Sequence, residues 1–112
     1  MSMKSEKSLA ARIRAAKRSI LELGDMRPGH LSAQKRASGG NTREYAQLSY
    51  TFQKRSRTDY IQAEDVGRVR QEIANYRKFK ALCERLVSLS IEESKRKTAL
   101  RRKAEKNVAH KK

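Results

Sequence analysis

The apolar residues near the N-terminus recur at helical spacing. Between residues 5 and 23 they are separated by four, three, four and three positions, at Leu9, Ile13, Ala16, Ile20 and Leu23. This spacing places them on one face of an amphipathic helix. Ser5 suits the N-cap of this helix, and Gly24 suits the left-handed position that follows a helix. We therefore predict a helix over residues 5–23 that packs against a partner surface.

The helical periodicity disappears between residues 25 and 43. This stretch contains Pro28-Gly29 and Ser38-Gly39-Gly40, which are residues typical of turns and loops. We predict a flexible loop over residues 25–43. Because a loop of this length is unusual in a compact domain, we expect it to be functional or to be ordered by a partner.

Apolar and polar residues then alternate strictly, which is typical of a half-buried strand. Ala46, Leu48, Tyr50 and Phe52 share one face of this strand. A second β-prone run, residues 57–61, follows closely enough to pair with the first strand through a turn at residues 53–56. We predict a β-hairpin over residues 45–61 that packs on a helix, because an isolated hairpin is marginally stable.

A long helix is predicted from residue 63, because no proline follows and the apolar residues form two adjacent stripes. We expect the core of the protein along this helix at residues 79–89. Lys80 interrupts one stripe. The first stripe contains Val69, Ile73, Tyr76, Cys83, Val87 and Ser90, and the second contains Phe79, Leu82, Leu86 and Leu89.

The predicted fold class is therefore α+β and mainly α. The N-terminal helix packs on the long C-terminal helix, and the hairpin lies between them in sequence. With 112 residues, the chain is long enough for one small domain, which we place at residues 1–94. Residues 95–112, which we call the basic tail, are predicted to be helical or disordered.

Charge changes this picture most strongly in the basic tail. The chain has a formal net charge of +16, and nine Lys and Arg residues of the basic tail face a single acidic residue, Glu105. Such a block of like charge is favoured when phosphates neutralise it, so the sequence points to nucleic acid as a partner. The predicted contacts lie in the loop, at the hairpin tip and in the basic tail: Lys35, Arg36, Arg43, Lys54, Arg55, Arg57, Lys95, Arg96, Lys97, Arg101, Arg102, Lys103 and Lys106.

Three short stretches carry a family resemblance over roughly residues 26–94. They are Met26-Arg27-Pro28-Gly29-His30-Leu31-Ser32, Tyr45-Ala46-Gln47-Leu48-Ser49-Tyr50-Thr51 and Ile73-Ala74-Asn75-Tyr76-Arg77-Lys78-Phe79. With Lys54-Arg55-Ser56-Arg57-Thr58 they make the chain similar to a small bacterial and archaeal family of uncharacterised proteins. The resemblance implies an association with mobile elements. It also implies a metal-binding cysteine cluster, but residues 34–41 of this chain contain no cysteine, so we expect no metal.

Catalytic motifs are missing from the sequence, and we expect neither enzymatic activity nor a cofactor. His30 and His110 are far apart and have no companion ligands. Cys83, the single cysteine, suits a small buried apolar residue on a helix. Without an apolar segment long enough to span a bilayer or a signal peptide, the protein is expected to be intracellular and cytoplasmic, in a prokaryote or a phage.

Two functions agree with these features. The first is a non-catalytic accessory protein that binds DNA or structured RNA in a mobile-element or phage nucleoprotein complex. The alternative is a protein-interaction or regulatory module whose helical stripes dock onto an acidic protein, a nucleic-acid enzyme or a second copy of the chain. The salt dependence of nucleic-acid binding and the oligomeric state separate the two hypotheses.

Overall fold

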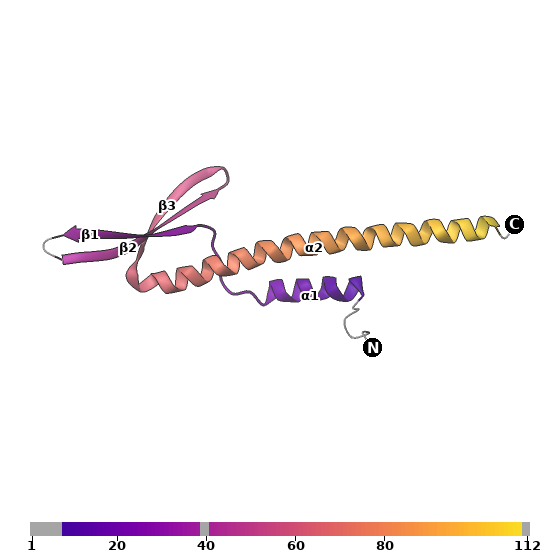
Figure 1. Cartoon of the computed structure of the whole chain (residues 1–112), viewed down its shortest axis with the longest axis horizontal. Coiled ribbons are helices and arrows are strands. Elements are labelled where there is room, and N and C mark those ends of the chain that lie inside the picture. The colour runs from indigo at the N-terminus through magenta and orange to yellow at the C-terminus, as the bar shows by residue number, and fades with distance from the viewer. Residues whose placement is uncertain (1–7, 39–40, 111–112) are drawn as a thin grey trace. The chain divides into compact units, whose positions relative to one another are not determined.

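The chain forms two helices with a three-stranded antiparallel sheet between them in sequence (Figure 1). The computed structural model describes residues 8–38 and 41–110, and the side chains of residues 8–33 and 45–107. The elements are α1 (Leu9–Leu21), β1 (His30–Ser38), β2 (Asn41–Phe52), β3 (Arg55–Gln62) and α2 (Ala63–His110). The predicted α+β class is confirmed.

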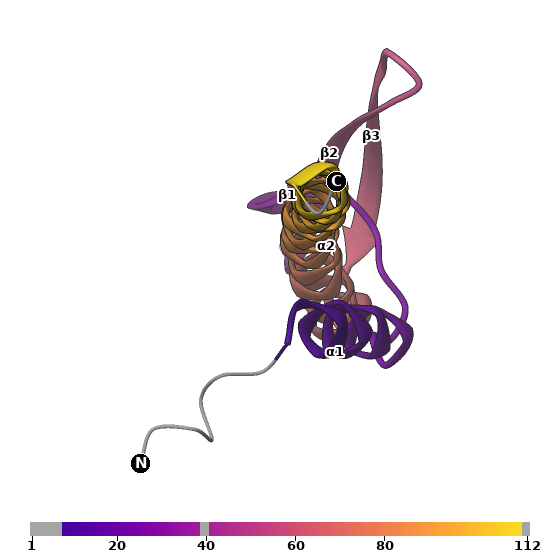
Figure 2. The same cartoon turned by 90° about the vertical axis from the view of Figure 1, so that its right-hand side faces the viewer.

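The structure divides into two compact units. One contains α1 together with the part of α2 that begins at Ala81, and the other contains residues Leu23–Lys80. In the first unit α1 runs alongside α2, as the two views show (Figures 1 and 2). The predicted stripe of α1 faces inward, because Ala16 is buried and Leu9, Ile13 and Ile20 are half-buried.

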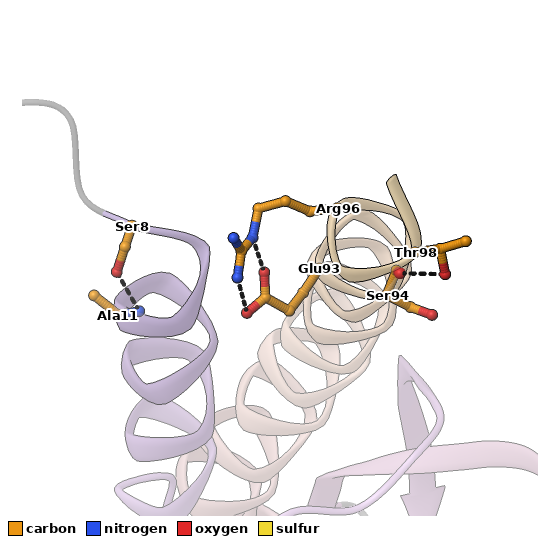
Figure 3. Close-up of polar contacts among 6 residues, drawn as sticks. All are labelled: Ser8, Ala11, Glu93, Ser94, Arg96 and Thr98. Atoms are coloured by element: carbon orange, nitrogen blue, oxygen red, sulfur yellow. Dashed lines mark hydrogen bonds and ion pairs between the residues drawn. The ribbon is translucent and has the colours of Figure 1, made fainter. Parts of the chain in front are cut away.

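The ends of α1 differ from the prediction. Ser8 is the N-cap, and its hydroxyl accepts a hydrogen bond of 3.1 Å from the Ala11 N–H (Figure 3). The predicted cap Ser5 lies outside the described residues. The helix ends at Leu21 with Glu22 as a right-handed C-cap, so Gly24 does not terminate it. The Glu22 N–H bonds back to the Arg18 and Ile20 carbonyls, which satisfies part of the helix end without a left-handed residue.

The predicted loop over residues 25–43 is correct only for residues 25–29, which belong to no helix or strand, and is wrong for the residues of β1 and β2. Residues His30–Ser38 form β1, and β2 begins at Asn41, so the hairpin is part of a three-stranded sheet in the order β1-β2-β3. β1 is an edge strand whose only strongly apolar residue is Leu31, and Ala33 and Ala37 follow it at alternate positions. Because alanine contributes little to a hydrophobic pattern, the alternation is faint in the sequence.

The turn between β2 and β3 is shorter than predicted. It consists of Gln53 and Lys54 alone, since Phe52 pairs with Arg55. Both turn residues have positive φ, 52° and 66°. A two-residue turn with two positive φ angles matches the right-handed twist of the strands, although Asn-Gly is its usual sequence.

The core lies elsewhere than predicted at residues 79–89. Its buried cluster joins the sheet to the first turns of α2 through Ala46, Leu48, Ile61, Val69 and Ile73, and Leu48 and Val69 are the most deeply buried. Of the predicted region only Leu89 is buried, in the unit that contains α1. The prediction failed because it counted apolar residues on α2 alone, whereas the sheet supplies three of the five core residues.

Candidate nucleic-acid interface

The basic tail is helical through His110 and its described side chains are exposed. α2 continues to that residue, and every side chain from Ser94 to Asn107 is open to solvent. Ala99, Leu100 and Ala104 are the apolar residues of this stretch, and Leu100 is 52% exposed. Lysine and arginine in the last turns of a helix also interact favourably with its macrodipole. The helix therefore exposes its cations to solvent rather than packing them.

Helical geometry gathers several of these cations on one side. Successive residues are about 100° apart around an α-helix, so residues four or seven positions apart lie on nearly the same side. Lys95, Arg102 and Lys106 follow this spacing, and Lys103 lies beside them. These four residues, which we call the tail face, span about 16 Å along the axis at 1.5 Å per residue.

A small side chain lies within the tail face. Ala99 lines a shallow open hollow together with Arg102, Lys103, Glu105 and Lys106. Three of the five lining side chains are basic, and the acidic one, Glu105, is paired with Arg101. A phosphate group can therefore approach several ammonium and guanidinium groups there.

Two predicted contacts of the basic tail are engaged with acidic residues of the same helix. Arg96 donates through Nε to Glu93 Oε1 at 2.6 Å and through Nη2 to Oε2 at 3.2 Å (Figure 3). This pairing lowers the pKa of Glu93, and the Glu93 side chain is only 14% exposed. Arg101 pairs with Glu105 at 2.7 Å. Among the described residues, Lys95, Lys97, Arg102, Lys103 and Lys106 form no ion pair.

The hairpin tip forms a second basic group. Lys54 lies in the turn, and Arg55 and Arg57 are on the following strand, with all three side chains exposed. Arg55 pairs with Phe52 and Arg57 with Tyr50 across the two strands. Phe52 is 53% exposed, although it shares a strand face with the fully buried Leu48. Tyr50 is half-buried and packs against the core.

The predicted loop contacts belong to the strands. Lys35 and Arg36 are in β1 and Arg43 is in β2, and the register pairs Arg36 with Arg43 and Lys35 with Glu44. Their side chains lie outside the described part of the structure.

One polar cluster was missed by the sequence reasoning. Arg27 forms an ion pair with Asp59 of β3, and its guanidinium carbon lies 5.2 Å from the centre of the Tyr50 ring. The Arg27 N–H also donates to the Glu72 carbonyl at 3.2 Å. Arg27 therefore connects the segment before β1 to the sheet through Asp59 and to α2 through the Glu72 carbonyl. An isolated Arg and Asp that are 32 residues apart give no recognisable spacing in the sequence.

Asp59 is the residue of this cluster that the contacts perturb. Its hydrogen bond from Arg27 lowers the pKa of the Asp59 carboxyl, partial desolvation opposes the shift, and the Tyr50 hydroxyl adds to the lowering. The carboxylate is held in its charged form because it is matched to a fixed cation. We interpret the cluster as structural.

Lys80 was expected to interrupt an apolar stripe, but its side chain is exposed. Its ammonium lies 5.5 Å from the centre of the Tyr76 ring, at a distance where a cation is attracted to an aromatic face.

Within residues 8–38 and 41–110, no helix is long and apolar enough to cross a membrane, and no group of three His, Cys, Asp or Glu side chains could hold a metal.

Comparison of the chain with protein-family models, with curated proteins and with solved structures finds no match.

Proposed function

We propose that this protein is a non-catalytic nucleic-acid-binding accessory protein. The observation that carries the proposal is the tail face: Lys95, Arg102, Lys103 and Lys106 lie on one side of an exposed helix and form no ion pair among the described residues. A phosphate backbone supplies closely spaced negative charges and releases counterions when lysine and arginine bind it. The partner nucleic acid belongs, on the resemblance of the sequence, to a mobile-element or phage nucleoprotein complex.

The basic groups differ in what each can contribute. The tail face supplies flexible side chains on a rigid helix, which suits contact with phosphates along a groove. The hairpin tip places Lys54, Arg55 and Arg57 on a narrow projection, where arginine can pair bidentately with phosphate. Arg96 and Arg101 are held by Glu93 and Glu105, so we rank them below the tail face as contacts.

The salt dependence of binding tests the proposal. We would measure the affinity of the full chain for duplex DNA and structured RNA at several salt concentrations, and repeat it with four substitutions, Lys95→Gln, Arg102→Gln, Lys103→Gln and Lys106→Gln. Each phosphate contact contributes about 0.9 to the slope of log K against log salt on B-DNA. We expect the four substitutions together to reduce that slope by about 3–4.

A matched control removes the same charge elsewhere on α2. Arg70→Gln, Arg77→Gln, Lys78→Gln and Arg85→Gln also remove four positive charges, from side chains that are exposed. This control should change the slope by less than about 0.9, which is the contribution of one phosphate contact. An equal loss in the two quadruple variants would mean that net charge alone drives binding, and the tail face would not be a site.

A second candidate function is a protein-interaction module, and one observation favours it. Leu21, Val87 and Ile91 are large apolar side chains that are 85%, 58% and 50% exposed in the unit that contains α1. Val87 and Ile91 are four positions apart on α2 and therefore lie on one side of it. Adjacent exposed apolar residues are a feature of association surfaces. A stable complex of the protein in the absence of nucleic acid, measured by light scattering, would support this second function.

A further inference from the structure

The face of the sheet that points away from α2 is open. Ala46, Leu48 and Ile61 pack against α2 from one side of the sheet, so the residues between them in sequence belong to the other side. Ser49, Thr58 and Tyr60 of that second side are exposed. No described residue of this face in β1, β2 or β3 is Lys, Arg, Asp or Glu.

Two tyrosines lie side by side on this open face. Tyr45 of β2 and Tyr60 of β3 are diagonal neighbours in the register, because Tyr45 pairs with Gln62 and Tyr60 with Gln47. Their ring centres are 5.8 Å apart and the rings are tilted by 56°. Tyr60 is 69% exposed. Its ring thus keeps a surface available for another planar group.

The surroundings of the tyrosines suit nucleobases better than a protein surface. The described neighbours on the same face are hydroxyl, amide and imidazole side chains, among them His30, Gln47, Ser49 and Thr58. A protein interface would bury aliphatic side chains, and this face offers none. Hydroxyls and amides can bind the edges of bases, while an exposed aromatic ring can stack on a base.

Positive charge for such a strand is available at the end of the same hairpin, about 20 Å from Tyr60 at roughly 3.3 Å per strand residue. The turn with Lys54 joins the same two strands that carry Tyr45 and Tyr60, and the chain as a whole has a formal net charge of +16. Duplex nucleic acid keeps its bases stacked inside and presents no ring to the tyrosines. An unpaired strand presents both its bases and its phosphates.

We propose that the open face of the sheet, centred on Tyr45 and Tyr60, is a stacking platform for the unpaired bases of single-stranded nucleic acid. This inference rests on the proposed function and extends it, because it assigns single strands to the sheet and leaves phosphate contacts of duplexes to the tail face. Tyr60 is the residue that stacks on a base, and Tyr45 supports its ring from the neighbouring strand.

The test uses the full chain and three fluorescently labelled probes: a 20-mer of oligo(dT), a 20-mer of oligo(U) and a 20-base-pair DNA duplex. Tyr60→Ala should weaken binding of at least one single strand by about fivefold to 100-fold, the range found when a stacking aromatic residue is removed. It should leave duplex affinity within twofold. Tyr60→Phe keeps the ring and should keep the affinity, so it is the matched control for the loss of the ring in Tyr60→Ala.

A measurement on the unaltered protein makes the test independent of how well Tyr60→Ala folds. The chain has no Trp and four Tyr residues, so its intrinsic fluorescence reports on tyrosine directly. Single strands should quench this fluorescence, and Tyr60→Phe should lose part of the quenching while binding equally well. The oligo(dT) and oligo(U) probes show whether the platform takes DNA, RNA or both.

The outcomes separate the platform from the broader proposal. If single strands bind through the tail face and Tyr60→Ala binds them as well as the unaltered protein, the platform is refuted and the proposed function stands. If the unaltered protein binds neither these three probes nor a structured RNA, the proposed function itself fails. Equal losses of single-strand and duplex affinity in Tyr60→Ala, with normal folding, would also refute the platform.

Discussion

Gly29 occupies the backbone position at which the chain enters β1. Its φ is +140°, and a Cβ atom there would lie 2.5 Å from Leu48 Cδ1 and 3.1 Å from the Ser49 carbonyl oxygen. Because Leu48 is fully buried, it has little room to move. We expect Gly29→Ala to lower the free energy of unfolding by about 2–4 kcal/mol, through backbone strain and overpacking together. Urea unfolding followed by circular dichroism would measure the loss.

The matched substitution is Gly67→Ala, in the second turn of α2. A Cβ atom at Gly67 would meet no other atom within 4 Å, so the alanine should stabilise the protein by about 0.5–1 kcal/mol through helix propensity. A similar effect of the two substitutions would contradict the close approach of Gly29 to Leu48.

The pattern of single residues explains why the sequence predicts α1 correctly but places the core at the wrong residues. The stripe of Leu9, Ile13, Ala16 and Ile20 predicts α1 well, because all its information lies within a few helical turns. Phe52 follows the same alternation as Leu48, yet it is exposed. Alternation fixes the face of a strand, but how far a covering helix extends along that face depends on tertiary packing.

At the scale of elements, the sequence predicts the helices and the β2–β3 hairpin but not β1. The overlooked signals are the alternation of Leu31, Ala33 and Ala37 and the dipeptide Gly39-Gly40, which is common between hairpin strands. Charge alone identifies the candidate contacts in the sequence. The helical geometry of α2 then shows which of those in the basic tail lie on one side. Sequence spacing could show the tail face, whereas the Tyr45–Tyr60 pair requires the register of β2 and β3.

The Arg27–Asp59 ion pair ties the segment before β1 to β3, and it should make the stability of the sheet sensitive to acid. The pKa of Asp59 is lowered from its ordinary value of 3.8 in the folded protein. A lowered pKa contributes stability that is complete above the unfolded pKa and is lost as the pH falls through the folded pKa. Asp59→Asn should therefore be less stable than the unaltered protein at pH 7, and the difference should shrink steadily below about pH 4.

Thermal unfolding between pH 7 and pH 2 would measure this difference. Glu84→Gln is a suitable control, because Glu84 is exposed and forms no ion pair among the described residues. A constant difference between Asp59→Asn and the unaltered protein over the whole pH range would show that the carboxylate charge is not what stabilises the sheet.

The charge of the whole molecule connects its stability to its partner. With a net charge of +16, the folded chain repels itself, and a polyanion that binds the folded state relieves the repulsion. A ligand present at 100 times its dissociation constant stabilises the folded state by about 2.7 kcal/mol. For a domain of this size we expect the preferred nucleic acid to raise Tm by about 10 °C.

Calorimetry of the full chain with and without nucleic acid would measure this shift, and the quadruple tail-face variant at the same nucleic-acid concentration should show a smaller one.

The comparison also tests whether the helical form of the basic tail matters. An unfolded cationic chain binds polyanions too, and only the difference in affinity between the folded and unfolded states changes Tm. If nucleic acid binds tightly and Tm stays constant, the folded and unfolded chains bind it equally well. Binding then does not depend on the arrangement of the cations along α2. A rise in Tm that requires Lys95, Arg102, Lys103 and Lys106 would mean that the helix holds them in the geometry the phosphates need.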